Sequence, residues 1–224
     1  MRAWRRIAAN TAFASLASLA VVVAASPAYG QAKKPAPRAS AASAAGKTGA
    51  ADYAERFRTA CAACHGANGR SDMPGVPVLA GQPSLYTITQ LFLFREGRRN
   101  NEAMIALAKA MTDDDLRGYS DLIGTLPPVP APAPAAPPDA ARMSKGQALA
   151  QQHKCLLCHG EKLEGGQQVP RIGGQKEDYV RATLQGFKSG ARPGYTRAMT
   201  EALSQVPVAD LDLLAYYVAN VAGK

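Results

Sequence analysis

Apolar side chains recur along this 224-residue chain at the three- and four-residue spacing of amphipathic helices. The two clearest stripes are Leu116, Tyr119, Leu122 and Ile123, and Leu211, Leu214, Val218 and Val221. A third pattern, over residues 51–62, places Tyr53 and Phe57 on one face of a helix. We find no run with the strict alternation of a half-buried strand, so the pattern predicts an all-α fold.

Helix boundaries in the first half follow from capping residues and glycines. We expect Ser84 to cap a helix over residues 85–96 that ends at Gly97. Thr112 is expected to cap the helix that carries the Leu116 stripe. Three aspartates at 113–115 would lie in its first turn, where the helix dipole favours negative charge.

The second half gives a similar set of three helices. We expect Ser144 to cap the first of them, residues 179–188 to form the middle one, and Pro207 to open the last.

The two halves are copies of one module. The sequence VPVLAGQ at 76–82 matches VPRIGGQ at 169–175, 93 positions later. At the same offset, Tyr86, Phe94 and Gly97 recur as Tyr179, Phe187 and Gly190. Such self-similarity indicates a duplication. We place the first domain at residues 51–126 and the second at residues 143–224.

A proline- and alanine-rich linker, residues 127–142, joins these domains. Its first twelve residues hold seven of the sixteen prolines of the chain. Such a composition favours extended polyproline II, which acts as a spacer without packing. Residues 31–50, rich in alanine, serine and lysine, are predicted to be a flexible segment.

The N-terminus has the pattern of an export signal. Arg2, Arg5 and Arg6 precede an apolar run at 11–25, which is shorter than the roughly 20 residues of a spanning helix. Small residues before Gln31 favour cleavage after Gly30 over retention as a membrane anchor. Removing residues 1–30 would leave 23 lysines and arginines against 17 acids, about +6, in a periplasmic protein.

The cysteines form two copies of one motif, CAACHG at 61–66 and CLLCHG at 155–160. A Cys-x-x-Cys pair suits zinc, a redox dithiol or haem attachment. Only haem attachment uses every position, because two thiols bond to the porphyrin and the next histidine ligates the iron. Exported cysteines normally form disulfides, and a Cys-x-x-Cys disulfide is small and strained. Short helices around a small core also need an apolar centre, so the motifs favour haem.

Methionine is the leading candidate for the sixth iron ligand. Met104 follows His65 by 39 residues and Met199 follows His159 by 40, each just before the last helix of its module. His153 is the one remaining histidine and is expected to be a helix residue, while Met111 is expected in the core and Met73 in a loop. The carbonyls of Pro77 and Pro170 are expected to orient the motif histidines through their other ring nitrogen.

On these motifs the chain resembles the dihaem cytochromes c of the cytochrome c4 family. The shared features are the two CxxCHG motifs, the two glycine–glutamine stretches, a tyrosine-led middle helix, the Phe-x-x-Gly turn, and a methionine before an acidic last helix. The resemblance implies two tandem class I cytochrome c-like helical domains, each wrapped round one covalent haem c group. It assigns thioether attachment to Cys61, Cys64, Cys155 and Cys158, and axial ligation to the pairs His65/Met104 and His159/Met199.

That family carries single electrons to membrane terminal oxidases in the bacterial periplasm, so the resemblance implies an electron carrier and not an enzyme. Expected partners are redox proteins such as a terminal oxidase, a cytochrome reductase or a periplasmic dehydrogenase, with peripheral contact to membrane complexes. The positive charge also suits nucleic acid, but the chain has no base-reading motif. Two departures from the family are the long proline-rich linker and SQVP at 204–207, where Leu-Ser-Asp is usual.

Two other functions stay open. The chain could be the electron-accepting cytochrome subunit of a periplasmic dehydrogenase, or a dihaem peroxidase in which Met104 or Met199 leaves the iron. Thiosulfate-oxidising dihaem enzymes have a similar module but use a cysteine ligand, and this chain has no fifth cysteine.

Overall fold

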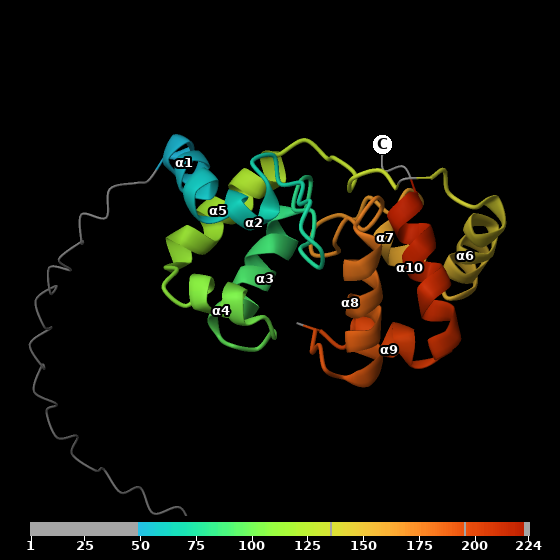
Figure 1. Ribbon diagram of the computed structural model, residues 1–224. Coiled ribbons are helices and arrows are strands. Elements are labelled where there is room, and N and C mark those ends of the chain that lie inside the picture. Colours follow the sequence, from blue (N-terminus) through green and yellow to red (C-terminus); the bar gives the residue numbers. More distant parts are fainter. Residues whose placement is uncertain (1–48, 135, 195, 222–224) are drawn as a thin grey trace, which may run out of the picture. The chain divides into compact units, whose positions relative to one another are not determined.

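The computed structural model describes residues 49–134, 136–194 and 196–221, which form helices joined by loops (Figure 1). The first half contains α1 (Ala50–Ala60), α2 (Ala62–His65), α3 (Ser84–Arg95), α4 (Glu102–Ala108) and α5 (Asp113–Thr125). The second contains α6 (Ala140–Gln152), α7 (Cys155–His159), α8 (Glu177–Ser189), α9 (Ala198–Ser204), the 3₁₀ helix η1 (Val208–Asp210) and α10 (Leu211–Asn220). Within these ranges the one β-type pairing is an isolated bridge between Gly166 and Val169, so the all-α prediction is confirmed.

The predicted signal peptide, residues 1–30, lies outside the described residues, as does residue range 31–48 of the predicted flexible segment. In the part of the chain that is described, no helix combines the length and the apolar character that crossing a membrane requires.

The first half is built on the predicted apolar stripes. Tyr53 and Phe57 of α1 are buried against Leu116, Tyr119 and Ile123 of α5. The rings of Tyr53 and Tyr119 meet edge to face, with their centroids 5.2 Å apart. Helix α3 packs against α5 from another side and adds Leu91 to the same cluster.

The second half has its own core, centred on α10. This helix packs against both α6 and α8 (Figure 1). Leu211, Leu214 and Val218 are buried as the stripe predicts, and Val221 is partly buried at the helix end. Each half therefore has a separate hydrophobic cluster.

Thr112 caps α5 as predicted, in a reciprocal arrangement. Its hydroxyl accepts a hydrogen bond from the Asp115 amide, and the Asp115 carboxylate accepts one from the Thr112 amide. The glycine at position 97, at φ +64°, ends α3 as predicted.

Two predicted caps are wrong. Ser84 is the first residue inside α3, whose N-cap position is Pro83, and the serine makes no capping hydrogen bond. Ser144 lies inside α6, which begins four residues earlier and is capped by Asp139 through a 2.7 Å bond from the Arg142 amide. Each helix starts earlier than predicted, after Pro83 in α3 and after Asp139 in α6, and the apolar pattern did not indicate these starts.

The linker also differs from the prediction, because part of it packs. A side-chain carbon added at Gly81 would come within 2.7 Å of Pro128, and one added at Gly174 within 3.2 Å of Pro130. The Ala131 amide donates a 2.7 Å hydrogen bond to the Gly174 carbonyl. Gly81 and Gly174 are equivalent positions of the repeat, so the linker contacts the same turn in both halves.

Hydrogen bonds also join the two halves directly, and all of them lie within the compact unit Ala44–Lys224. The side-chain amide of Gln82 donates to the Arg171 carbonyl at 2.7 Å. Gln175, its counterpart in the repeat, donates to the Val78 carbonyl at 2.9 Å and accepts from the Val78 amide at 2.8 Å. The duplicated glutamines thus exchange hydrogen bonds across the repeat.

Candidate haem sites

Each cysteine motif forms one short helical turn that ends at a glycine. Helix α2 ends at Gly66, with φ +77°, and α7 ends at Gly160, with φ +84°. A side chain at Gly66 would place its first carbon 2.2 Å from the Arg70 carbonyl oxygen, so only glycine fits this turn. The turn places each histidine at the end of a helical segment that also carries the two thiols.

The two motif histidines are buried and oriented by proline carbonyls, as predicted. Nδ1 of His65 lies 3.1 Å from the Pro77 carbonyl oxygen, and Nδ1 of His159 lies 3.0 Å from that of Pro170. A carbonyl only accepts, so Nδ1 carries the proton and the lone pair is on Nε2. Burial lowers the pKa of both imidazoles, against the opposing effect of the proline hydrogen bonds. Both rings are thus neutral, the form that ligates a metal.

The surroundings of the thiols favour neither a redox dithiol nor a zinc centre. All four are free, and burial raises the pKa of the Cys61 thiol to about 11, against a smaller opposing effect of Arg56. Burial raises the pKa of the Cys155 thiol as well. A reactive dithiol needs the opposite shift. Among the described residues, no three histidine, cysteine, aspartate or glutamate side chains group as metal ligands, whereas zinc needs four.

The two candidate methionines lie on short helices that the apolar pattern did not predict. Met104 is on α4 and packs against the same cluster as Cys61, while Met199 is on α9 and packs against the same cluster as Cys155. The structure therefore brings each methionine to the core that carries its cysteine motif. Each half thus places one thiol of its motif and a half-buried thioether on one apolar cluster, with a neutral imidazole in the same motif, and these groups fit a covalent haem.

The remaining candidates are placed differently. Met111 is partly buried against the first core, in line with a packing role, and Met73 is 47% exposed in a loop. His153 ends α6 with Nε2 3.9 Å from a carboxylate oxygen of Asp210, on the side of η1. It belongs to the packing between α6 and η1.

A cluster of two arginines and two tyrosines was missed by the sequence reasoning. Arg99 donates to the Tyr179 hydroxyl at 2.9 Å and to Gln90 at 2.8 Å. Arg192 donates to Tyr179 at 3.4 Å and to the Thr183 hydroxyl at 2.6 Å. None of these partners is a carboxylate.

The surroundings of this cluster shift the pKa values of its two tyrosines in opposite directions. Burial acts to raise the pKa of Tyr179, but the attraction of Arg99 and Arg192 outweighs it and lowers that pKa to about 7. Burial and the neighbouring Tyr179 raise the pKa of Tyr86. Arg99 and Arg192 are equivalent in the repeat, as are Tyr86 and Tyr179, so the duplication contained the signal that identifies all four.

Comparisons with known proteins agree with this site. The cytochrome c family model matches residues 43–120 and 143–222. A thiosulfate dehydrogenase electron acceptor of Thiomonas intermedia is 34% identical over 60% of this chain and 65% of its own length. Cytochrome c4 of Thiocapsa roseopersicina is 36% identical over 59% of this chain and 71% of its own length.

A solved structure of cytochrome c4 from Acidithiobacillus ferrooxidans matches 72% of this chain and 99% of its own, with a TM-score of 0.63 and 26% identity. Two family matches, one over each half, agree with the two cysteine motifs and with two covalent haem c groups. The chain belongs to the cytochrome c family, as a dihaem electron-transfer protein of the cytochrome c4 type.

Proposed function

We propose that this protein is a periplasmic carrier of single electrons, with one haem in residues 51–126 and the other in residues 143–224. The haems are attached through Cys61 and Cys64, and through Cys155 and Cys158. The axial ligands are His65 with Met104, and His159 with Met199. A bound haem supplies an iron that takes up and releases one electron.

The observation that supports the proposal is that each half offers an oriented imidazole and a methionine near its cysteine motif. The proline carbonyl fixes each imidazole with Nε2 free for the iron. A methionine lies on the same apolar cluster as the cysteine motif. Two protein ligands that stay in place keep the site unchanged when an electron arrives, and methionine favours a higher potential than a second histidine.

The cluster of Arg99, Arg192, Tyr86 and Tyr179 supports the same proposal. Haem carries two carboxylates, and a buried carboxylate needs charged and hydrogen-bonding partners. Arg99 and Arg192 provide guanidinium groups whose hydrogen-bond partners include no carboxylate. The cluster therefore suits carboxylates from haem in one or both halves.

The test is a spectrum of the purified ferric protein, with the far-red iron–methionine band quantified per haem, followed by carbon monoxide after reduction. Two full bands and no gas binding are expected for an electron carrier. One missing band with one haem binding the gas would instead favour a dihaem peroxidase.

A second candidate function is electron acceptor of a dedicated dehydrogenase. It rests on the similarity to the thiosulfate dehydrogenase electron acceptor of Thiomonas intermedia. Purified thiosulfate dehydrogenase with thiosulfate would reduce the protein rapidly if it serves this function. Reduction by a quinol-oxidising reductase alone would favour a general carrier between that reductase and a terminal oxidase.

The proposed periplasmic location rests on the pattern of residues 1–30. Cell fractionation and the mass of the mature chain test it. The expected product begins at Gln31, and a cytoplasmic protein that keeps residues 1–30 would contradict the proposal.

A further inference from the structure

A basic side chain extends from the end of each middle helix toward the methionine-bearing segment. Arg95 is the last residue of α3, and Lys188 is the penultimate residue of α8. They are 93 positions apart, the same offset that relates Gln82 to Gln175. The two cations are therefore counterparts in the repeat, although one is an arginine and the other a lysine.

In the second half the contact is direct. Nζ of Lys188 donates to the carbonyls of Leu203, at 3.0 Å, and Ser204, at 2.7 Å. These are the last two residues of α9, the helix that carries Met199. Unsatisfied carbonyls and the negative end of the dipole make a helix C-terminus a favourable place for a cation.

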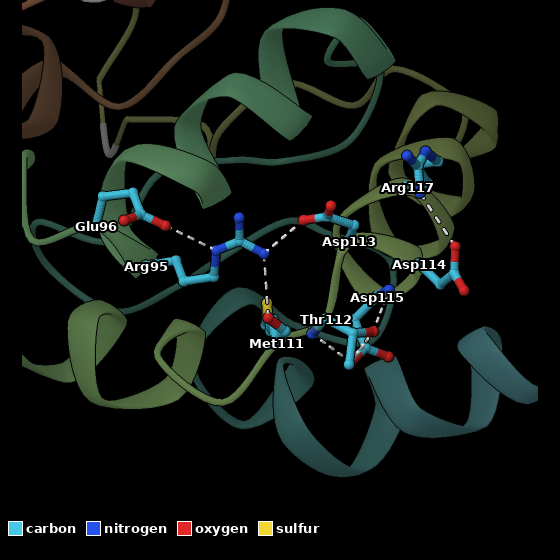
Figure 2. Close-up of polar contacts among 8 residues, drawn as sticks. All are labelled: Arg95, Glu96, Met111, Thr112, Asp113, Asp114, Asp115 and Arg117. Atoms are coloured by element: carbon cyan, nitrogen blue, oxygen red, sulfur yellow. Dashed lines mark hydrogen bonds and ion pairs between the residues drawn. The ribbon is translucent and has the colours of Figure 1, made fainter. Parts of the chain in front are cut away.

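In the first half Arg95 has the corresponding position (Figure 2). Nη1 donates to the Met111 carbonyl at 3.3 Å and to Asp113 at 2.8 Å, while Nε donates to Glu96 at 3.1 Å. Met111 follows α4, the helix of Met104, and its amide donates to the Ala108 carbonyl at the α4 terminus. The arginine thus connects α3 to the end of the Met104 segment and to the start of α5.

Both methionine helices need such support because each has seven residues. Helices of this length are marginal in water and depend on tertiary contacts. Met199 lies in the first turn of α9, and Lys188 holds the last turn. Because so short a helix depends on its tertiary contacts, we expect loss of the lysine contact to weaken α9 and the placement of Met199.

We propose that Arg95 and Lys188 are positioning residues for the methionine ligands, each holding its own segment so that the thioether reaches the iron. The inference rests on the proposed function, since it requires Met104 and Met199 to be ligands. Leu203 and Val206 are buried in the second core by apolar contacts, so we expect the second half to fold when Lys188 is replaced.

The test uses the full haem-loaded protein with Lys188→Met, which keeps the length of the side chain and removes the charge. A charged hydrogen bond is worth enough to shift the balance between methionine-bound and methionine-free iron roughly tenfold. We expect weakening of the far-red band of one haem, a lower potential for that haem, and carbon monoxide binding to it alone. Arg95→Met should produce the same changes at the other haem.

Two controls separate positioning from charge. Lys188→Arg can donate to the same carbonyls and should restore the band, while Lys145→Met removes a cation from an exposed position on α6 and should change neither band nor potential. Parental spectra in Lys188→Met, or an equal loss in Lys145→Met, would overturn the inference. An unchanged far-red band in Met199→Ala would instead overturn the ligand assignment of the proposed function.

Discussion

In the proposed ligation a single methionine closes each iron, so Met104 and Met199 are the first residues to test. Met104→Ala or Met199→Ala should leave both haems attached, because neither residue belongs to a cysteine motif. One iron should open, so half of the haem should bind carbon monoxide and its potential should fall, since the thioether is lost. Redox titration with carbon monoxide binding checks this expectation. A variant with two unchanged potentials would exclude that methionine as a ligand.

Asp115 links acidity to the stability of the first half. Burial acts to raise the pKa of its carboxyl, but hydrogen bonds from the Thr112 amide and from Arg56 at 2.7 Å outweigh this and lower the pKa. Since the folded pKa is below the unfolded one, the stabilisation is present above the unfolded value and is lost as pH falls through the folded value.

Asp115→Asn should therefore lower the free energy of unfolding by about 1 kcal/mol at pH 7. The difference from the parent should shrink below about pH 4, near the ordinary pKa of aspartate. Thermal unfolding between about pH 3 and about pH 7 measures it. Asp114→Asn, at a carboxylate whose side chain is 77% exposed, is the matched control and should change little. A pH-independent difference would argue against the charge of Asp115.

The sequence was informative about single residues where two signals agreed. The CxxCH spacing and the repeat identified the cysteines and histidines, and the prolines that hold the histidines were correctly expected. Arg95 and Lys188, near the ends of helices, and Arg99 and Arg192, in the loops that follow, were missed because charged residues at such positions carry no periodic signal. Their contacts are long-range, and only the duplication marks them.

At the scale of elements, helix existence was predictable and helix starts were not. The apolar stripes identified the helices of Tyr53, Leu116 and Leu211, because those faces form the cores. Helices α4 and α9 were missed because seven residues are too few to show a period. Ser144 was expected at a cap but lies inside α6, since Asp139, five residues earlier, offers a carboxylate that caps the helix.

This difference gives a prediction for α6. Asp139→Ala should destabilise the second half by about 1 kcal/mol, because the Arg142 amide loses its acceptor. Ser144→Ala should be neutral or stabilising by up to about 0.5 kcal/mol, because alanine has the higher helix propensity at this exposed position. Chemical denaturation of the two variants side by side decides between them. A larger loss from Ser144→Ala would restore the serine as the cap.

At the scale of the whole molecule, we expect the hydrogen bonds of Gln82 and Gln175 between the two halves to couple their unfolding. Gln175 is buried and uses both ends of its amide on Val78, so Gln175→Ala should cost about 1–3 kcal/mol. We expect the thermal transition of the haem-loaded protein to separate into two. Calorimetry measures this, with Gln151→Ala, at an exposed position of α6, as the control. A single unshifted transition in Gln175→Ala would mean that other contacts carry the coupling.

The duplication itself was readable from the sequence, but the contacts between the copies were not. A sequence repeat indicates that two modules share a fold, but it does not indicate which residues of one module contact the other. Gln82 and Gln175 lie in the matching stretches at 76–82 and 169–175. The sequence alone does not show whether such a glutamine bonds within its own module or to the other module.

The contacts of the linker with Gly81 and Gly174 have a consequence for its length. Pro128 and Pro130 are two residues apart, and two extended residues span at most about 7 Å. An insertion between these prolines would leave one of them out of register with its glycine. The same insertion after Pro132 would leave both contacts intact. The length of the linker is thus constrained between Pro128 and Pro130 and can vary after Pro132. The effect of an inserted residue on these contacts should depend on where it is inserted.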